Sequence, residues 1–188
     1  MILDPGFAWR GGRIVAERQG ARVRSFRVHS SAKPALSISS SEHFALPRIH
    51  PGLRDVGVYL GTFGAASRPL EVLSALKSVL MQIPGARSAT RAAVTRIVKG
   101  SPGAPDADTR AKSDSLVVAA AYDGTGSKPL QARLAGVNVY DFTAGMLSWG
   151  GQQAAAGALQ DTGALGPIEG FGLDPLPTGA AEAGLARQ

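Results

Sequence analysis

The chain contains no cysteine among its 188 residues. This absence excludes a disulfide framework, a thiol nucleophile and a zinc–thiolate site. It fits a reducing compartment, and we expect a cytoplasmic protein. The first residues lack the pattern of a secretory signal, and no run of about 18 apolar residues occurs, so we expect no membrane partner.

Aromatic residues are also scarce, at 6% of the chain, whereas 24 residues are glycine. The apolar fraction of 44% is enough for a core, which we expect to use close backbone packing in place of large rings. The net charge of +6 is compatible with an anionic partner. The basic residues are scattered singly, however, and we do not expect nucleic acid to bind. These scattered residues include Arg10, Arg13, Arg18, Arg22, Arg24 and Arg27.

Motifs for nucleotide phosphates, metals and hydrolysis are missing as well. A dinucleotide-binding domain would show Gly-x-Gly-x-x-Gly between a strand and a helix, and no glycine group stands in that context. No Gly-x-Ser-x-Gly elbow of a serine hydrolase occurs. The three histidines, His29, His43 and His50, lack the close spacing of metal ligands. We therefore expect no metal site, and no cofactor bound by this chain alone.

Strand patterns dominate the first 65 residues. Gly11 and Gly12 predict a hairpin turn, and broken alternation after Val23 predicts a bulge or an edge strand. The strands expected in this region cover residues 7–9, 13–15, 21–28, 36–39 and 56–60.

Helical spacing then predicts helices within residues 66–100, at 69–83 and 87–98. We expect a loop over residues 101–112 and a hairpin over 113–138, with strands at 116–122 and 130–137. A helix should follow within residues 139–158, with Asp141 as a candidate N-cap. The Gly/Pro-rich residues 159–188 predict a closing segment with at most a short helix near 180–185.

This order of elements predicts an α+β fold. We expect a single domain over residues 1–188, with a mixed, largely antiparallel sheet and helices packed on one face.

The densest polar cluster lies directly after the strand at 36–39; it covers residues 39–43 and is followed by residues 47–51. Glu42 next to His43 would support proton transfer, which makes both catalytic candidates. Arg48 would hold a carboxylate in a bidentate fork, so Arg48 and Ser41 are candidates for substrate binding. In a structural alternative, Glu42 caps a helical turn beginning at Ser40 or Ser41 and His43 is a surface or interface residue.

The predicted helix after Tyr140 contains Gly145, Gly150, Gly151 and Gly157. Each glycine costs up to about 1 kcal/mol of helix stability relative to alanine. Such a helix needs close packing against another surface, which an adjoining domain or a second subunit would supply.

Two stretches of the sequence resemble the C-terminal part of saccharopine dehydrogenase-like oxidoreductases. The first is SEHFALPR at 41–48, with LRDV at 53–56 and YLG at 59–61; the second is GVNVYDFTA at 136–144, with WG at 149–150. The resemblance extends over about residues 4–185. Thr62 and Ser148 depart from it, where tryptophan and alanine are expected, and Thr62 removes a large apolar surface.

The resemblance implies an N-terminal Rossmann domain that binds NAD(P), followed by an α+β domain for substrate binding and dimer formation. The Rossmann domain is absent here, so the chain would be the second part of such an enzyme, or a fragment of it. With NAD or NADP bound elsewhere, it would contribute to hydride transfer on a small-molecule substrate. We expect Tyr140, Asp141 and Trp149 at the domain junction, and a homo-oligomer.

Two rival functions come from other classes. One is a non-catalytic binding or assembly module, paired with a separately encoded nucleotide-binding chain. The other, the weakest, is a basic nucleic-acid-binding domain. In each reading, we expect the chain alone to be inactive as an oxidoreductase.

Overall fold

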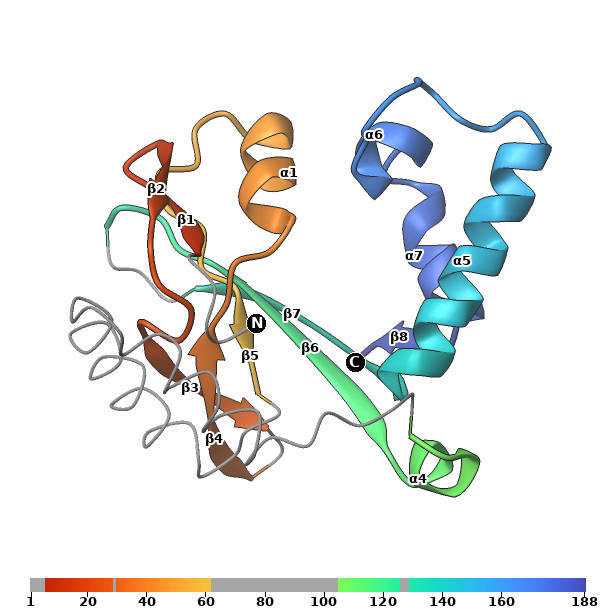
Figure 1. Cartoon of the computed structure of the whole chain (residues 1–188), viewed down its shortest axis with the longest axis horizontal. Helices are drawn as coiled ribbons and strands as arrows, with labels where there is room; N and C mark the ends of the chain where they lie inside the picture. Colours follow the sequence, from red (N-terminus) through yellow and green to blue (C-terminus); the bar gives the residue numbers. More distant parts are fainter. Residues whose placement is uncertain (1–5, 29, 62–104, 126–128) are drawn as a thin grey trace, which may run out of the picture. The chain divides into compact units, whose positions relative to one another are not determined.

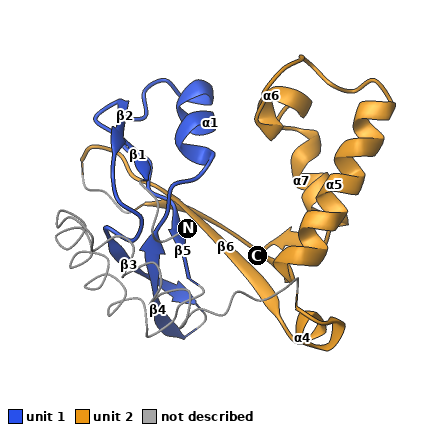
Figure 2. Cartoon of the chain, in the orientation of Figure 1, with its two compact units in different colours: residues 1–100 blue, residues 101–188 orange. Residues whose placement is uncertain are grey.

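The computed structural model describes residues 6–28, 30–61, 105–125 and 129–188, and it confirms the α+β class (Figure 1). The chain divides into two compact units, residues 1–100 and 101–188 (Figure 2). The expected single domain over residues 1–188 stays a prediction. The described strands form three separate antiparallel sheets. The helices expected at 69–83 and 87–98 lie outside the described residues.

Unit 1 begins with the predicted hairpin. Strand β1 (Phe7–Arg10) pairs with β2 (Arg13–Ala16). The turn residues Gly11 and Gly12 have φ of 57° and 78°. Positive φ at both central positions suits the right-handed twist of a two-residue hairpin, and it favours glycine at each.

The second sheet of unit 1 has the order β3–β4–β5. Strand β3 (Val23–Val28) pairs with β4 (Ser31–Ser37) in an uninterrupted register, so β3 is an edge strand of the described sheet without a bulge. Strand β4 begins at Ser31, well before the predicted 36–39. The sequence did not indicate the first half of this strand, because that half is exposed and lacks apolar alternation. Strand β5 is only Tyr59–Leu60; Val56 instead forms an isolated bridge with Trp9.

The core of unit 1 uses small and medium side chains. Its buried apolar residues include Ala8, Ala35, Leu36 and Val56. The Trp9 indole Nε1 donates to the Leu53 carbonyl at 2.9 Å, which ties the loop after the helix at 42–49 to β1. This packing agrees with a chain that is poor in aromatic residues.

Unit 2 contains the predicted hairpin of β6 (Asp114–Ala121) and β7 (Leu130–Val137), which pair over their full length. A short strand, β8 (Leu185–Arg187), extends this sheet beside β7. The prediction of a loosely structured closing segment at 159–188 is therefore wrong. It also contains α6 (Pro167–Phe171) and α7 (Pro175–Glu182), and each begins with a proline, whose fixed φ suits the first helical turn.

The loop expected over 101–112 contains a short helix, α4 (Ala107–Ala111). The Thr109 amide donates to the Asp106 carboxylate at 2.7 Å, which makes Asp106 the N-cap. This backbone hydrogen bond holds the pKa of Asp106 below its ordinary value of 3.8. The aspartate that helped to predict a loop thus begins a helix.

Helix α5 (Val139–Ala155) has Asn138, not Asp141, as its N-cap, so that prediction is wrong. The Asn138 Oδ1 accepts from the amides of Tyr140 and Asp141, each at 3.0 Å. At the other end, Gly157 has φ of 75°, and its amide donates to Ala154 O while the next amide donates to Gln153 O. This Schellman pattern ends the helix before the predicted residue 158.

The glycines of α5 are explained by close packing inside unit 2. A Cβ on Gly145 would lie 2.9 Å from Ala183 Cβ, and one on Gly150 would lie 3.5 Å from the Phe171 ring. On the opposing helix α7, a Cβ on Gly179 would lie 2.7 Å from Trp149 Cδ2. Much of the surface that α5 requires therefore comes from α6 and α7 of the same unit.

We predict that Gly179→Ala destabilises the chain, because the added methyl group would overlap the buried Trp149 indole. Overpacking of this kind costs about 1–3 kcal/mol. Gly151→Ala is the matched control: it also lies in a helix, but a Cβ there meets nothing within 4 Å. It should raise the free energy of unfolding by up to about 1 kcal/mol. Urea unfolding followed by far-UV circular dichroism measures both, and equal stability of the two variants would contradict the packing.

Candidate functional site

The polar cluster predicted as a site lies on a short helix of unit 1, α1 (Glu42–Ile49). Ser39, just before it, is fixed to β1: its hydroxyl accepts from the Phe7 amide at 2.7 Å and donates to the Phe7 carbonyl at 2.8 Å. Ser41 is the N-cap position but makes no side-chain capping bond. The candidate residues Ser41, Glu42, His43 and Arg48 are thus carried by one helix anchored on the first hairpin.

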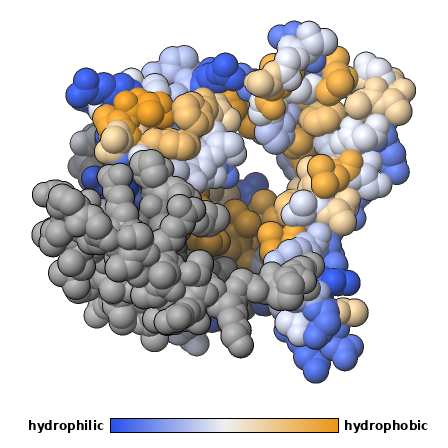
Figure 3. All heavy atoms as spheres, in the orientation of Figure 1, coloured by the Kyte–Doolittle hydropathy of each residue, from blue (hydrophilic) through white to orange (hydrophobic). Residues whose placement is uncertain are grey.

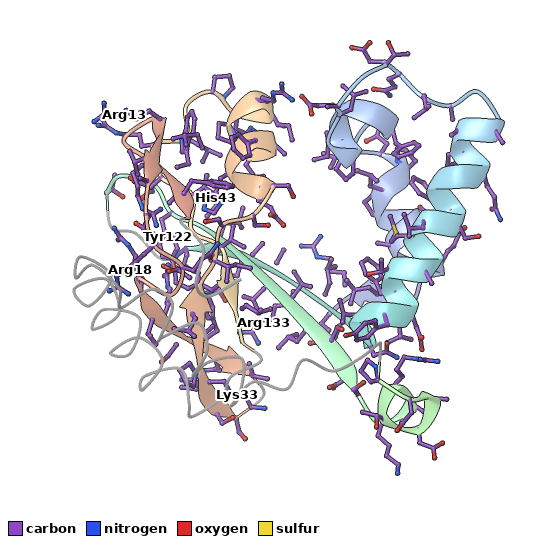
Figure 4. All side chains as sticks on the ribbon, in the orientation of Figure 1. Arg13, Arg18, Lys33, His43, Tyr122 and Arg133 are labelled. Atoms are coloured by element: carbon purple, nitrogen blue, oxygen red, sulfur yellow. The ribbon has the colours of Figure 1, made fainter. Side chains whose placement is uncertain are left out.

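His43 is enclosed by protein and is only 1% exposed. Its Nδ1 lies 3.2 Å from the Ser40 backbone nitrogen and 3.0 Å from the Ser40 carbonyl oxygen. The ring meets the Phe7 ring edge-on at 5.8 Å, between α1 and β1 (Figure 4). This geometry suits a residue that holds the start of α1 and packs it on the hairpin. A substrate could reach the ring only if this packing opened.

Glu42 is exposed and interacts with the serines before it. Its Oε2 accepts from the Ser40 hydroxyl, and the Ser41 hydroxyl lies 3.5 Å from the same oxygen. Among the residues that the structure describes, no hydrogen bond joins Glu42 to His43. Neighbouring positions on a helix point about 100° apart, so the two side chains diverge. The structure therefore does not bring together the pair expected to transfer a proton, and their catalytic roles stay predictions.

Ser41 and Arg48 are both exposed but lie at opposite ends of α1. Seven residues of helix separate them by roughly 10 Å along its axis. A ligand that contacts both side chains would have to extend along the helix. Their roles in substrate binding stay predictions too.

The residues expected at a domain junction have different surroundings in unit 2. Trp149 is 8% exposed and packs against Phe171, with ring centroids 5.2 Å apart, so its indole is covered within the unit. Asp141 accepts from Asn138 Nδ2 at 2.7 Å and forms an ion pair with Arg110 at 3.5 Å. Tyr140 is half exposed, and it alone of the three directs much apolar surface outward.

Sequence reasoning missed an ionic cluster at the first hairpin. The Glu17 side chain is 16% exposed and forms two ion pairs. Its Oε1 lies 3.1 Å from Arg10 Nη2, and its Oε2 lies 3.2 Å from Arg22 Nε. Arg10 also donates to the Val56 carbonyl at 2.6 Å. Glu17 is the only acidic residue between positions 6 and 41, and its isolation among arginines was the available signal.

Within residues 6–28, 30–61, 105–125 and 129–188, no group of three histidine, aspartate or glutamate residues is arranged to hold a metal ion. No helix in the same part of the chain has the length and apolar character needed to cross a membrane.

Comparison with known proteins returns nothing: no protein-family model, no curated protein and no solved structure matches the chain. The resemblance to saccharopine dehydrogenase-like proteins stays a prediction.

We predict that His43→Ala lowers the free energy of unfolding by about 2–4 kcal/mol, because it removes a buried ring and its hydrogen bond to the Ser40 backbone. His50→Ala is the matched control, since His50 is near the solvent-accessible end of the same helix, and it should change stability by less than about 0.5 kcal/mol. Urea unfolding of both variants checks this. A His43→Ala protein as stable as the His50→Ala protein would show that His43 is not a structural residue.

Proposed function

We propose that the chain is the substrate-binding and dimerisation part of a saccharopine dehydrogenase-like oxidoreductase. It would contribute to NAD(P)-dependent hydride transfer only together with a nucleotide-binding domain. The observation that carries the proposal is the amount of apolar surface that unit 2 leaves exposed.

This surface includes one side of α5. Leu147 is 72% exposed and Tyr140 is 47% exposed, and a spacing of seven places them on the same face of the helix. Ala144 and Gly151 continue that face, so it is flat as well as apolar. Apolar residues are visible on the surface of the part of the chain that holds α5, α6 and α7 (Figure 3).

The hairpin of unit 2 adds a second apolar area. Its register places Val117 opposite Leu134 and Ala121 opposite Leu130 on one face. Leu130 is 80% exposed and Val117 is 47% exposed. Contiguous exposed apolar area of this kind is typical of contact with further protein.

The sequence resemblance supports a Rossmann domain as that further protein. Residues 136–144 contain Asn138 and the start of α5, so the resembling stretch and the exposed helix coincide. In the family, the corresponding partner is an NAD(P)-binding Rossmann domain. Arg48 and Ser41, both exposed on α1, remain the proposed substrate contacts, whereas buried His43 would act by positioning that helix.

A second candidate is a non-catalytic binding or assembly module. It is favoured by the enclosure of His43 and by the bond of Glu42 to Ser40, which together leave the predicted proton-transfer pair unformed. Such a module would use the same apolar surface without taking part in hydride transfer.

We predict that the purified chain does not bind NADPH, because no phosphate loop is present in its sequence. If the reading frame continues upstream of residue 1, the chain joined to that segment should bind NADPH with a Kd in the micromolar range. NADPH fluorescence measures both. Saturable binding by the chain alone would contradict the proposal, and an upstream segment without nucleotide binding would favour the assembly module.

A substitution tests the apolar surface in the extended protein. Leu147→Glu should weaken NADPH binding or lower the melting temperature by several degrees, since it places a charge on the proposed contact. Gln152→Glu is the control, with the same new charge at an exposed position of α5 away from Leu147. Equal effects of the two would count against a contact through this face.

A further inference from the structure

Charge is divided very unevenly between the two units. Residues 1–100 contain 15 basic and 5 acidic residues, a net charge of +10, whereas residues 101–188 contain 5 basic and 9 acidic residues, a net charge of −4. The modest total of +6 therefore conceals a strongly basic unit 1. Such an asymmetry favours an anionic partner for that unit.

Part of this charge is gathered on one face of the β3–β4–β5 sheet, together with two aromatic rings. Side chains alternate along a strand, so Arg24 and Phe26 of β3 share a face. The register places Lys33 of β4 directly opposite Phe26, and Tyr59 pairs with Ser37 on the same side. We refer to Arg24, Phe26, Lys33 and Tyr59 as the Phe26 face.

The contacts within the Phe26 face confirm this arrangement. The Arg24 guanidinium lies over the Phe26 ring, 5.7 Å from its centroid. The Phe26 and Tyr59 rings are 5.5 Å apart and tilted by 59°. Arg24 and Lys33 are exposed, and both rings are partly exposed. Lys33 lies near the end of the hairpin (Figure 4).

Rings and cations on one sheet face match the chemistry of single-stranded nucleic acid. Unpaired bases stack on aromatic side chains, while lysine and arginine neutralise the phosphates beside them. A duplex keeps its bases stacked inside and offers the rings no surface. An anionic lipid surface is usually bound by an amphipathic helix, whereas this face is part of a sheet.

We propose that the Phe26 face of unit 1 binds single-stranded nucleic acid, with Phe26 and Tyr59 against bases and Lys33 against phosphate. This activity is independent of a dehydrogenase role. The basic residues are scattered singly along the sequence, but the register of β3 and β4 places Arg24 and Lys33 on the same face as the two rings.

The test uses the full chain and a fluorescein-labelled oligothymidylate of about 12 nucleotides, a length within the range of known single-strand sites. Fluorescence anisotropy should show binding at low salt that weakens steeply as salt rises. Lys33→Glu should reduce the affinity by about tenfold and lower the salt slope by about one. Arg13→Glu is the matched control: it makes the same charge change at an exposed position beside the turn of the first hairpin, and it should reduce affinity by less than about threefold.

Phe26→Leu separates stacking from charge, because it keeps apolar bulk without the ring. It should weaken binding by about tenfold while the salt slope stays unchanged. Urea unfolding of each variant confirms that the fold is retained. Equal losses for Lys33→Glu and Arg13→Glu would overturn the proposal in favour of general attraction. Tighter binding of duplex DNA, or binding of phosphatidylserine vesicles without oligonucleotide binding, would overturn it as well.

Discussion

The contact between the Trp149 indole and Gly179 sets the structure of unit 2. The ring is nearly covered, and the absence of a side chain on Gly179 allows α7 to lie directly against it. Helices α5 and α7 can then approach closely, as Gly145 against Ala183 also shows. A chain with 6% aromatic residues has few rings to fill a core, and Trp149 packs both on the Phe171 ring and directly against Gly179.

A glycine makes the turn from α7 into β8. Gly184 has φ of 94°, and its carbonyl accepts from the Val137 amide, so the chain turns sharply from α7 into β8 beside β7. Leu185, 3% exposed, is the first residue of β8. Residues 185–187 are therefore part of the sheet of unit 2, and the chain changes direction at Gly184 just before them.

The sequence predicted those elements whose signal is local. The hairpin at Gly11 and Gly12, the strands of residues 113–138 and the helix after Asn138 follow from turn chemistry and periodicity. The closing segment could not be predicted, because α6, α7 and β8 are too short for periodicity and depend on Trp149 and β7 for their place. The N-cap was misplaced because Asp141 and Asn138 are both good capping residues, and only the structure shows whose oxygen faces the free amides.

The candidate site shows why nearness in sequence is a poor guide to chemistry. Glu42 and His43 are adjacent, and the helix turns one toward solvent and the other into the core. Phe26 and Lys33 are seven residues apart, and the hairpin places them opposite each other. Helix periodicity and strand pairing, not distance along the chain, decide which side chains meet. Neighbours in a helix point about 100° apart, whereas the pairing of β3 with β4 brings Phe26 and Lys33 to one face.

The two surfaces of this protein belong to different units and suit different partners. The exposed apolar residues of α5 and the β6–β7 hairpin belong to unit 2, whose net charge is −4, and they suit contact with protein. The Phe26 face belongs to unit 1, whose net charge is +10, and it suits an anion with aromatic groups. Because no residue is shared between them, a partner on one surface does not compete for side chains with a ligand on the other. A protein that uses both would join an assembly through unit 2 and leave unit 1 to bind its ligand.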